Sequence, residues 1–67
     1  MNKVFIAKLI DINGQRIRGW AEGLLTDDTE PGRFRVIDPE THNELIKGAT
    51  DTFLQTLMRQ DLMRIVH

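Results

Sequence analysis

The chain has 67 residues, no cysteine, and nine lysines and arginines against ten aspartates and glutamates, which gives a net charge of −1. This length predicts one small domain, residues 1–67, with a marginal core, because a chain of this size buries only about 60% of its unfolded surface. The composition excludes disulfide bridges and thiolate metal sites, and no apolar run is long enough to span a membrane. Because the start has no signal-peptide pattern, we expect a cytoplasmic protein without membrane contacts.

The first predicted element is a β-hairpin from Lys3 to Leu25, turning at Asn13-Gly14. Asn-Gly favours a type I′ turn, which needs positive φ at both central residues. This turn sets the register and so divides the side chains between two faces. We expect the core face to hold these pairs: Ile12 with Gln15, Ile10 with Ile17, Lys8 with Gly19, Ile6 with Ala21 and Val4 with Gly23. The other face pairs Asp11 with Arg16, Leu9 with Arg18, Ala7 with Trp20 and Phe5 with Glu22.

A second hairpin is predicted after an exposed acidic loop at Thr26–Gly32. Residues Arg33–Ile37 form a strand by their β-branched and aromatic content, and Asp38–Asn43 form a turn that the Asp38 carboxylate can cap. Residues Glu44–Lys47 then return as a short strand. Two hairpins in sequence make a four-stranded antiparallel meander.

The end of the chain predicts one amphipathic helix, separated from the sheet by Gly48 and capped at its start by Thr50 or Asp51. Apolar residues recur at helical spacing and would cover the sheet at Gly19, Ala21 and Gly23: Phe53, Leu54, Leu57, Met58, Leu62 and Ile65. The fold class is therefore α+β, a four-stranded meander packed on one C-terminal helix. In the alternative, the helix ends near Gln60 and Leu62–Val66 add a short final strand that closes a small barrel-like sheet.

One predicted sheet face combines basic and aromatic side chains. Arg16, Arg18 and Trp20 alternate along the second strand, Arg33 and Arg35 along the third, and Phe5 lies opposite. If the two strands are neighbours, four guanidinium groups surround Trp20. Such a face can bind single-stranded nucleic acid, or it can form a protein interface, because Trp and Arg are favoured interface anchors. It can also be a solvated face, and the lack of net positive charge favours that interpretation over nucleic-acid binding.

Two polar clusters contain residue types that bind metal ions. The loop carboxylates Asp27, Asp28 and Glu30 lack the spacing of a calcium loop, and Pro39 breaks the alternation of Asp38, Glu40 and His42. The chain also has no Ser, Cys or Tyr nucleophile and no glycine-rich phosphate loop. We therefore predict no catalytic residue, no metal and no cofactor.

These patterns favour a non-catalytic binding protein that acts through protein contacts as a homodimer. Its predicted binding residues share one sheet face: Phe5, Arg16, Arg18, Trp20, Arg33 and Arg35. Dimerisation is expected because the small core has no disulfide to support it, and because Met63 and the strand at Glu44–Lys47 offer contact surfaces. A nucleic-acid-binding regulator that uses the same face is the alternative, and a small metal-dependent enzyme is the least favoured.

Overall fold

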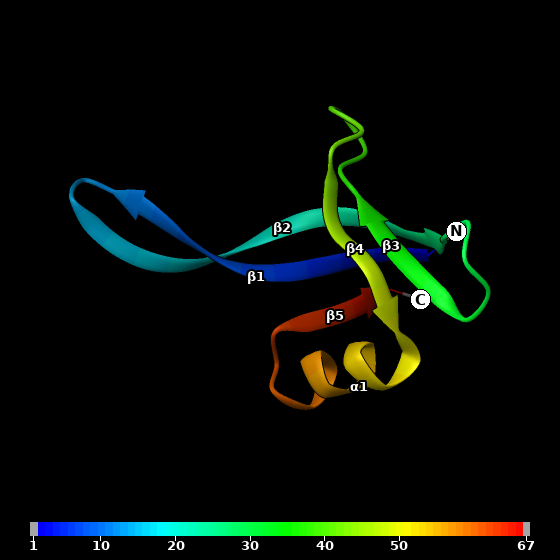
Figure 1. Cartoon of the computed structure of the whole chain (residues 1–67). Coiled ribbons are helices and arrows are strands. Elements are labelled where there is room, and N and C mark those ends of the chain that lie inside the picture. The colour runs from blue at the N-terminus through cyan, green and yellow to red at the C-terminus, as the bar shows by residue number, and fades with distance from the viewer. Residues whose placement is uncertain (1, 67) are drawn as a thin grey trace.

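The computed structural model describes residues 2–66, so Met1 and His67, the ends of the predicted domain, lie outside the described residues. The described part forms five strands and one helix: β1 (Asn2–Ile12), β2 (Gln15–Asp27), β3 (Arg33–Ile37), β4 (Glu44–Thr50), α1 (Asp51–Arg59) and β5 (Met63–Val66). All strand pairs are antiparallel, in the order β4-β3-β2-β1-β5 (Figure 1). The α+β class is confirmed, whereas the predicted count of four strands is one too few.

The first hairpin has the predicted register throughout. Ile12 lies opposite Gln15 and Val4 opposite Gly23, with no irregularity between them. Asn13 and Gly14 both have positive φ, 52° and 77°, as a type I′ turn requires. The local turn signal was therefore sufficient to place every cross-strand pair of β1 and β2.

The single long helix is wrong, and the alternative with a final strand is correct apart from its closure. The helix ends at Arg59, Asp61 turns the chain at a φ of 57°, and the Leu62 amide donates to the Leu57 carbonyl at 2.8 Å. Residues 63–66 then pair with residues 3–6 of β1. The free edge of β1 gives this segment backbone hydrogen bonds that an isolated helix end lacks. The sheet stays open, because β4 and β5 lie at opposite edges.

Gly48 does not separate the sheet from the helix, because β4 continues through it to Thr50. The pairing of β3 with β4 is irregular here, and Gly48 has a φ of 64°, a conformation that suits glycine in a bulge. Of the two predicted caps, Thr50 and Asp51, the structure shows Thr50: its Oγ1 accepts a hydrogen bond from the Phe53 amide at 3.1 Å. The bulge lengthens β4 and places the start of α1 beside the sheet.

The core lies between the inner half of the sheet and α1. Its buried side chains come from four strands and the helix: Val4, Val36, Ala49, Leu54 and Met63. The predicted cover over Gly19 by the helix is wrong, because α1 packs mainly against β4 and β5 and leaves Phe53 48% exposed. Ile10 of the same hairpin fills the space at Gly19, and Val36 of β3 fills the space at Gly23.

The outer half of the first hairpin projects from this core as an arm, residues 8–19 (Figure 1). β5 pairs with β1 only up to Ile6, and β3 pairs with β2 only from Leu24 onward. The radius of gyration, 12.5 Å, exceeds the value of about 11 Å typical of a compact domain of this length. The predicted core role of Ile17 is accordingly wrong: its side chain lies on the arm and is 43% exposed.

Candidate functional site: the Trp20 surface

Trp20 lies at the base of the arm, and two arginines approach its ring. Its direct neighbour on β1 is Ala7, whose single methyl group leaves the indole room to lie across β1 toward β5. Arg64 of β5 stacks there, with its Cζ 4.3 Å from the ring centroid. Arg18, two residues before Trp20 on the same face, places its Cζ 5.8 Å from the ring. Both distances are within the range of cation–π attraction.

Asp61 holds these two arginines in place. Arg64 donates to both carboxylate oxygens of Asp61, each at 3.1 Å, in a bidentate ion pair. Arg18 donates from Nη2 to the Asp61 backbone carbonyl, also at 3.1 Å. The hydrogen bonds from Arg64 lower the pKa of Asp61 below its ordinary value and raise the pKa of Arg64. The turn after the helix therefore orients both guanidinium groups at Trp20.

Phe5 continues this surface on β1, directly opposite Arg64 on one side and Glu22 on the other. Together Phe5, Trp20 and Arg64 line a shallow hollow. Lys3 borders it, with its Nζ 5.7 Å from the Phe5 ring and 2.6 Å from a Glu22 carboxylate oxygen. We call the central group the Trp20 surface, defined by these residues: Phe5, Arg18, Trp20, Asp61 and Arg64.

The predicted cluster of four arginines around Trp20 does not form. Strands β2 and β3 are neighbours, but their register places Arg35 opposite Thr26. Six residues separate Thr26 from Trp20, which corresponds to about 20 Å along a strand. Arg33 instead donates to the Gly48 carbonyl at 3.1 Å.

The two other predicted arginines also have separate environments. Arg35 has a buried Nε without a hydrogen-bond partner in the described residues. Arg16 lies near the tip of the arm, opposite Asp11. Of the six predicted binding residues, the structure therefore brings Phe5, Arg18 and Trp20 together and leaves the three others apart.

Sequence reasoning missed Arg64 and Asp61. Within a single amphipathic helix, Arg64 was an ordinary residue of the polar side. The signal that could have found it was the alternative final strand, in which Arg64 alternates with the apolar Met63 and Ile65. Pairing with β1 then places Arg64 beside Phe5 and next to the Trp20 ring.

In both polar clusters, a carboxylate accepts hydrogen bonds from the backbone of its own turn. Asp38 accepts hydrogen bonds from the amides of Glu40 at 2.8 Å and Thr41 at 3.1 Å, and these bonds lower the pKa of its carboxyl. In the acidic loop, Asp28 accepts from the Thr29 amide at 2.6 Å. Within residues 2–66, no group of three His, Asp or Glu side chains is placed to hold a metal ion.

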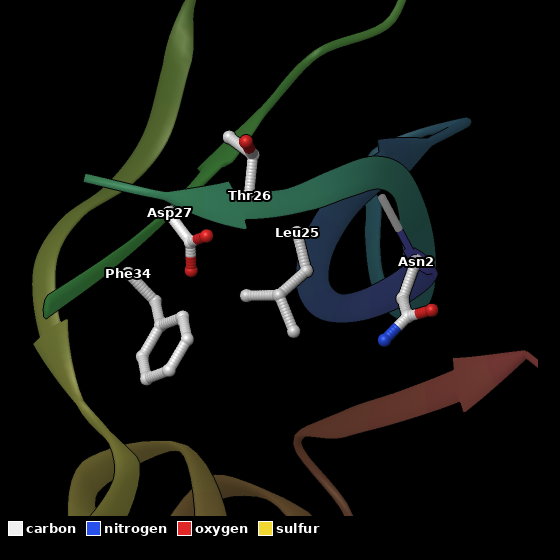
Figure 2. A pocket seen from close by; sticks show the side chains of 5 residues that line it. All are labelled: Asn2, Leu25, Thr26, Asp27 and Phe34. Atoms are coloured by element: carbon white, nitrogen blue, oxygen red, sulfur yellow. The ribbon is translucent and has the colours of Figure 1, made fainter. Parts of the chain in front are cut away.

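A second hollow lies at the other end of β2 from the arm. Figure 2 shows Leu25 and Phe34 pointing into the same space, with the Asp27 carboxylate beside them and Asn2 across from it. Its lining residues include one aromatic ring, Phe34, and one carboxylate, Asp27, but no arginine or lysine and no tryptophan. The Trp20 surface is therefore the stronger candidate site.

No helix in the described part of the chain is long and apolar enough to cross a membrane. Comparisons with protein-family models, curated proteins and solved structures found no match to this chain.

Proposed function

We propose that this protein is a non-catalytic binding protein that acts as a homodimer and contacts a protein partner through the Trp20 surface. The observation that carries the proposal is the stacking of Arg64 on Trp20, at 4.3 Å from the ring centroid, in a half-exposed position. Trp and Arg are the residue types most enriched among the few interface residues that dominate binding energy. The cysteine-free sequence suits a reducing compartment, so the proposal places the protein in the cytoplasm.

The charges around Trp20 favour a protein partner. Arg18 and Arg64 both contact Asp61, and the neighbouring Lys3 pairs with Glu22. The surface therefore presents both signs of charge close together, as the polar rim of a protein interface does. A nucleic-acid site would instead present a basic stripe, and the whole chain has a net charge of −1.

Preorganisation also supports this use. The bidentate pair with Asp61 restricts the long side chain of Arg64, and the stacking restricts Trp20. A partner would therefore lose less side-chain entropy when it immobilises these groups, which is a common route to tighter binding.

The test is affinity capture with the immobilised full chain, followed by a binding titration of any captured protein. Trp20→Ala should weaken that binding by about 30-fold, the effect of a residue worth about 2 kcal/mol. Arg64→Ala should weaken binding as well. Arg59→Ala is the matched control, because Arg59 is an exposed arginine at the end of α1. Unchanged binding by a folded Trp20→Ala protein would refute the proposed surface.

A nucleic-acid-binding regulator is the second candidate, favoured by one observation. An aromatic ring beside two guanidinium groups is a combination that stacks bases and contacts phosphates. Fluorescence anisotropy with short single-stranded and duplex oligonucleotides at low and higher salt separates the two candidates. Binding that weakens steeply with salt, and that Trp20→Ala reduces, would replace the protein partner with nucleic acid. No binding at low salt would reject this candidate.

A further inference from the structure

Within residues 2–66, no strand pairs with the outer edge of β2 between Gln15 and Glu22, and the backbone groups of this edge point outward. The Ala7 amide donates to the Leu62 carbonyl at 2.9 Å, away from β2. Its direct partner Trp20 must then direct its own amide and carbonyl away from β1, because antiparallel pairs alternate in this respect. By the same alternation, four residues of this edge direct their backbone amide and carbonyl outward: Arg16, Arg18, Trp20 and Glu22. We call them the outward-pointing residues. β3 covers β2 only from Leu24 onward.

We propose that a second copy of this chain pairs antiparallel along this edge, around a two-fold axis at Gly19. The inference rests on the homodimer of the proposed function and names the element that forms it. In a two-fold pairing, each residue lies opposite the residue equally far on the other side of the axis. Gly19 then faces Gly19 of the second copy, and the backbones of the four outward-pointing residues supply the hydrogen bonds.

Charge complementarity and the number of free backbone groups together select this register. Arg16 lies opposite Glu22 of the second copy, and Arg18 lies opposite Trp20 of the second copy. Because of the symmetry, each contact occurs twice. Opposite charges are favourable directly across antiparallel strands. On the other face, the exposed Ile17 meets Ala21 of the second copy and loses contact with water.

The neighbouring registers are less favourable. An axis at Arg18 would place that arginine against its own copy, and like charges directly opposite are destabilising. An axis at Trp20 would also pair opposite charges, Arg18 with Glu22 of the second copy, but it would place Arg16 opposite Leu24, whose backbone already pairs with Ile37 of β3. Only three of the four outward-pointing residues could then form backbone hydrogen bonds. The axis at Gly19 uses only backbone groups that β1 and β3 leave free.

The features of this strand edge favour a second copy of the chain as its partner. The free stretch from Gln15 to Glu22 contains no proline and no bulge, two of the devices that keep strand edges from pairing, and its edge charges are of both signs and so match those of a second copy. The chain has a small core and no disulfide, so self-association is the remaining common source of stability. Edge pairing also extends the sheet without covering its faces, so the Trp20 surface stays open to a partner.

Charge reversal with rescue tests the register in the full chain. Sedimentation equilibrium should show a dimer for the natural sequence. Arg16→Glu and Glu22→Arg should each weaken dimerisation at least tenfold, because each places like charges opposite one another. The double variant should return to within about threefold of the natural dimer. Glu40→Arg, the same change in the exposed 38–43 turn, is the control and should leave the dimer intact.

A cysteine scan gives an independent readout, since the natural chain has none. Opposed residues in a non-hydrogen-bonded antiparallel pair lie about 4.5 Å apart at Cα, within the range of a disulfide. Gly19→Cys should therefore form a covalent dimer with oxidised glutathione as the oxidant. Its added Cβ meets only the flexible end of Ile10 at 2.7 Å. Lys8→Cys, directly opposite Gly19 on β1, is the matched control and should stay mostly monomeric under the same conditions.

The inference would be overturned if the natural chain is monomeric at about 0.1 mM, a concentration well above the Kd of a stable dimer. A dimer that is unaffected by both single charge reversals would overturn it too. The two proposals fail separately. Loss of partner binding in Trp20→Ala, with no effect of the charge reversals on dimerisation, would support the Trp20 surface and refute the edge pairing. Unchanged partner binding in Trp20→Ala, with dimerisation weakened by the charge reversals, would refute the Trp20 surface alone.

Discussion

Arg64 stacks on Trp20 with its Cζ 4.3 Å from the ring centroid, although the two residues come from opposite halves of the chain. β1 lies between their strands, and the small Ala7 allows the indole to reach across it. The Asp61 carboxylate fixes the guanidinium from the other side. The candidate site therefore depends on the fifth strand, because without β5 neither Arg64 nor Asp61 would lie near the ring.

The pH dependence of Asp61 reports on this arrangement. The hydrogen bonds from Arg64 lower the pKa of Asp61 below 3.8, so the folded state favours the ionised carboxylate more than the unfolded state does. The contribution of this pair to stability is therefore present above the unfolded pKa and is lost as the pH falls through the folded one. In a titration followed by carboxyl ¹³C NMR, Arg64→Gln should raise the pKa of Asp61.

Asp38 is the internal control for this titration. Its pKa is also lowered, but chiefly by hydrogen bonds from the amides of Glu40 and Thr41. Arg64→Gln should therefore leave the titration of Asp38 unchanged. An Asp61 pKa that stays low in Arg64→Gln would show that the ion pair is not its cause.

Two glycines of β2 should respond differently to alanine. A Cβ at Gly23 would collide with Val36, which is fully buried and has little room to move. Gly23→Ala should therefore lower the free energy of unfolding by about 1–3 kcal/mol, as overpacking does. A Cβ at Gly19 meets the end of the Ile10 side chain at 2.7 Å, on the arm, where Ile10 can change its rotamer. Gly19→Ala should cost less than about 1 kcal/mol.

Urea denaturation of both variants at one protein concentration measures this difference. Equal losses of stability would mean that Ile10 is held as firmly as Val36, and that the arm is more rigidly packed than its exposed side chains indicate.

The cap of α1 gives a third prediction. Thr50 Oγ1 accepts from the Phe53 amide, so Thr50→Ala should lower the free energy of unfolding by about 1 kcal/mol. Thr52→Ala is the matched control, because Thr52 lies within the first turn and its side chain makes no hydrogen bond in the described structure. That substitution should change stability by no more than about 0.5 kcal/mol. Thermal unfolding followed by circular dichroism compares the two variants.

The fold was predictable from sequence where the deciding signal is local. Asn13-Gly14 sets every pair of the first hairpin, and the sequence limits the N-cap of the helix to Thr50 or Asp51, of which the structure uses Thr50. The fifth strand was not decidable in this way. Leu62 and Ile65 fit the helical spacing of the preceding apolar residues, and only the free edge of β1, a feature of the assembled sheet, favours the strand.

The site was predictable in part for the same reason. Phe5, Arg18 and Trp20 share a face that follows from the hairpin register alone. The positions of Arg33 and Arg35 relative to Trp20 depend on the register of β3 against β2. The alternation of side chains along each strand does not determine that register. The face was therefore predicted correctly, but Arg35 lies about 20 Å along the strand from Trp20, and Arg33 lies farther still.

Met63 provides the sharpest test of the fifth strand. A helix through this segment would place Met63 off the apolar stripe, where it would contact a partner. In the structure it lies on β5 opposite Ile6 and is only 1% exposed. Met63→Ala should therefore lower the free energy of unfolding by about 2–5 kcal/mol, the range for truncating a buried methionine.

Met58→Ala is the matched control for Met63, because Met58 packs at the edge of the core and is only partly buried. It should cost less than Met63→Ala in the same urea denaturation. Hydrogen exchange of the Phe5 amide adds a second readout. Phe5 pairs with Arg64 of β5, so loss of β5 would expose this amide to solvent and speed its exchange. A Met63→Ala protein as stable as the natural chain, with Phe5 still protected, would contradict the packing of β5 against the core.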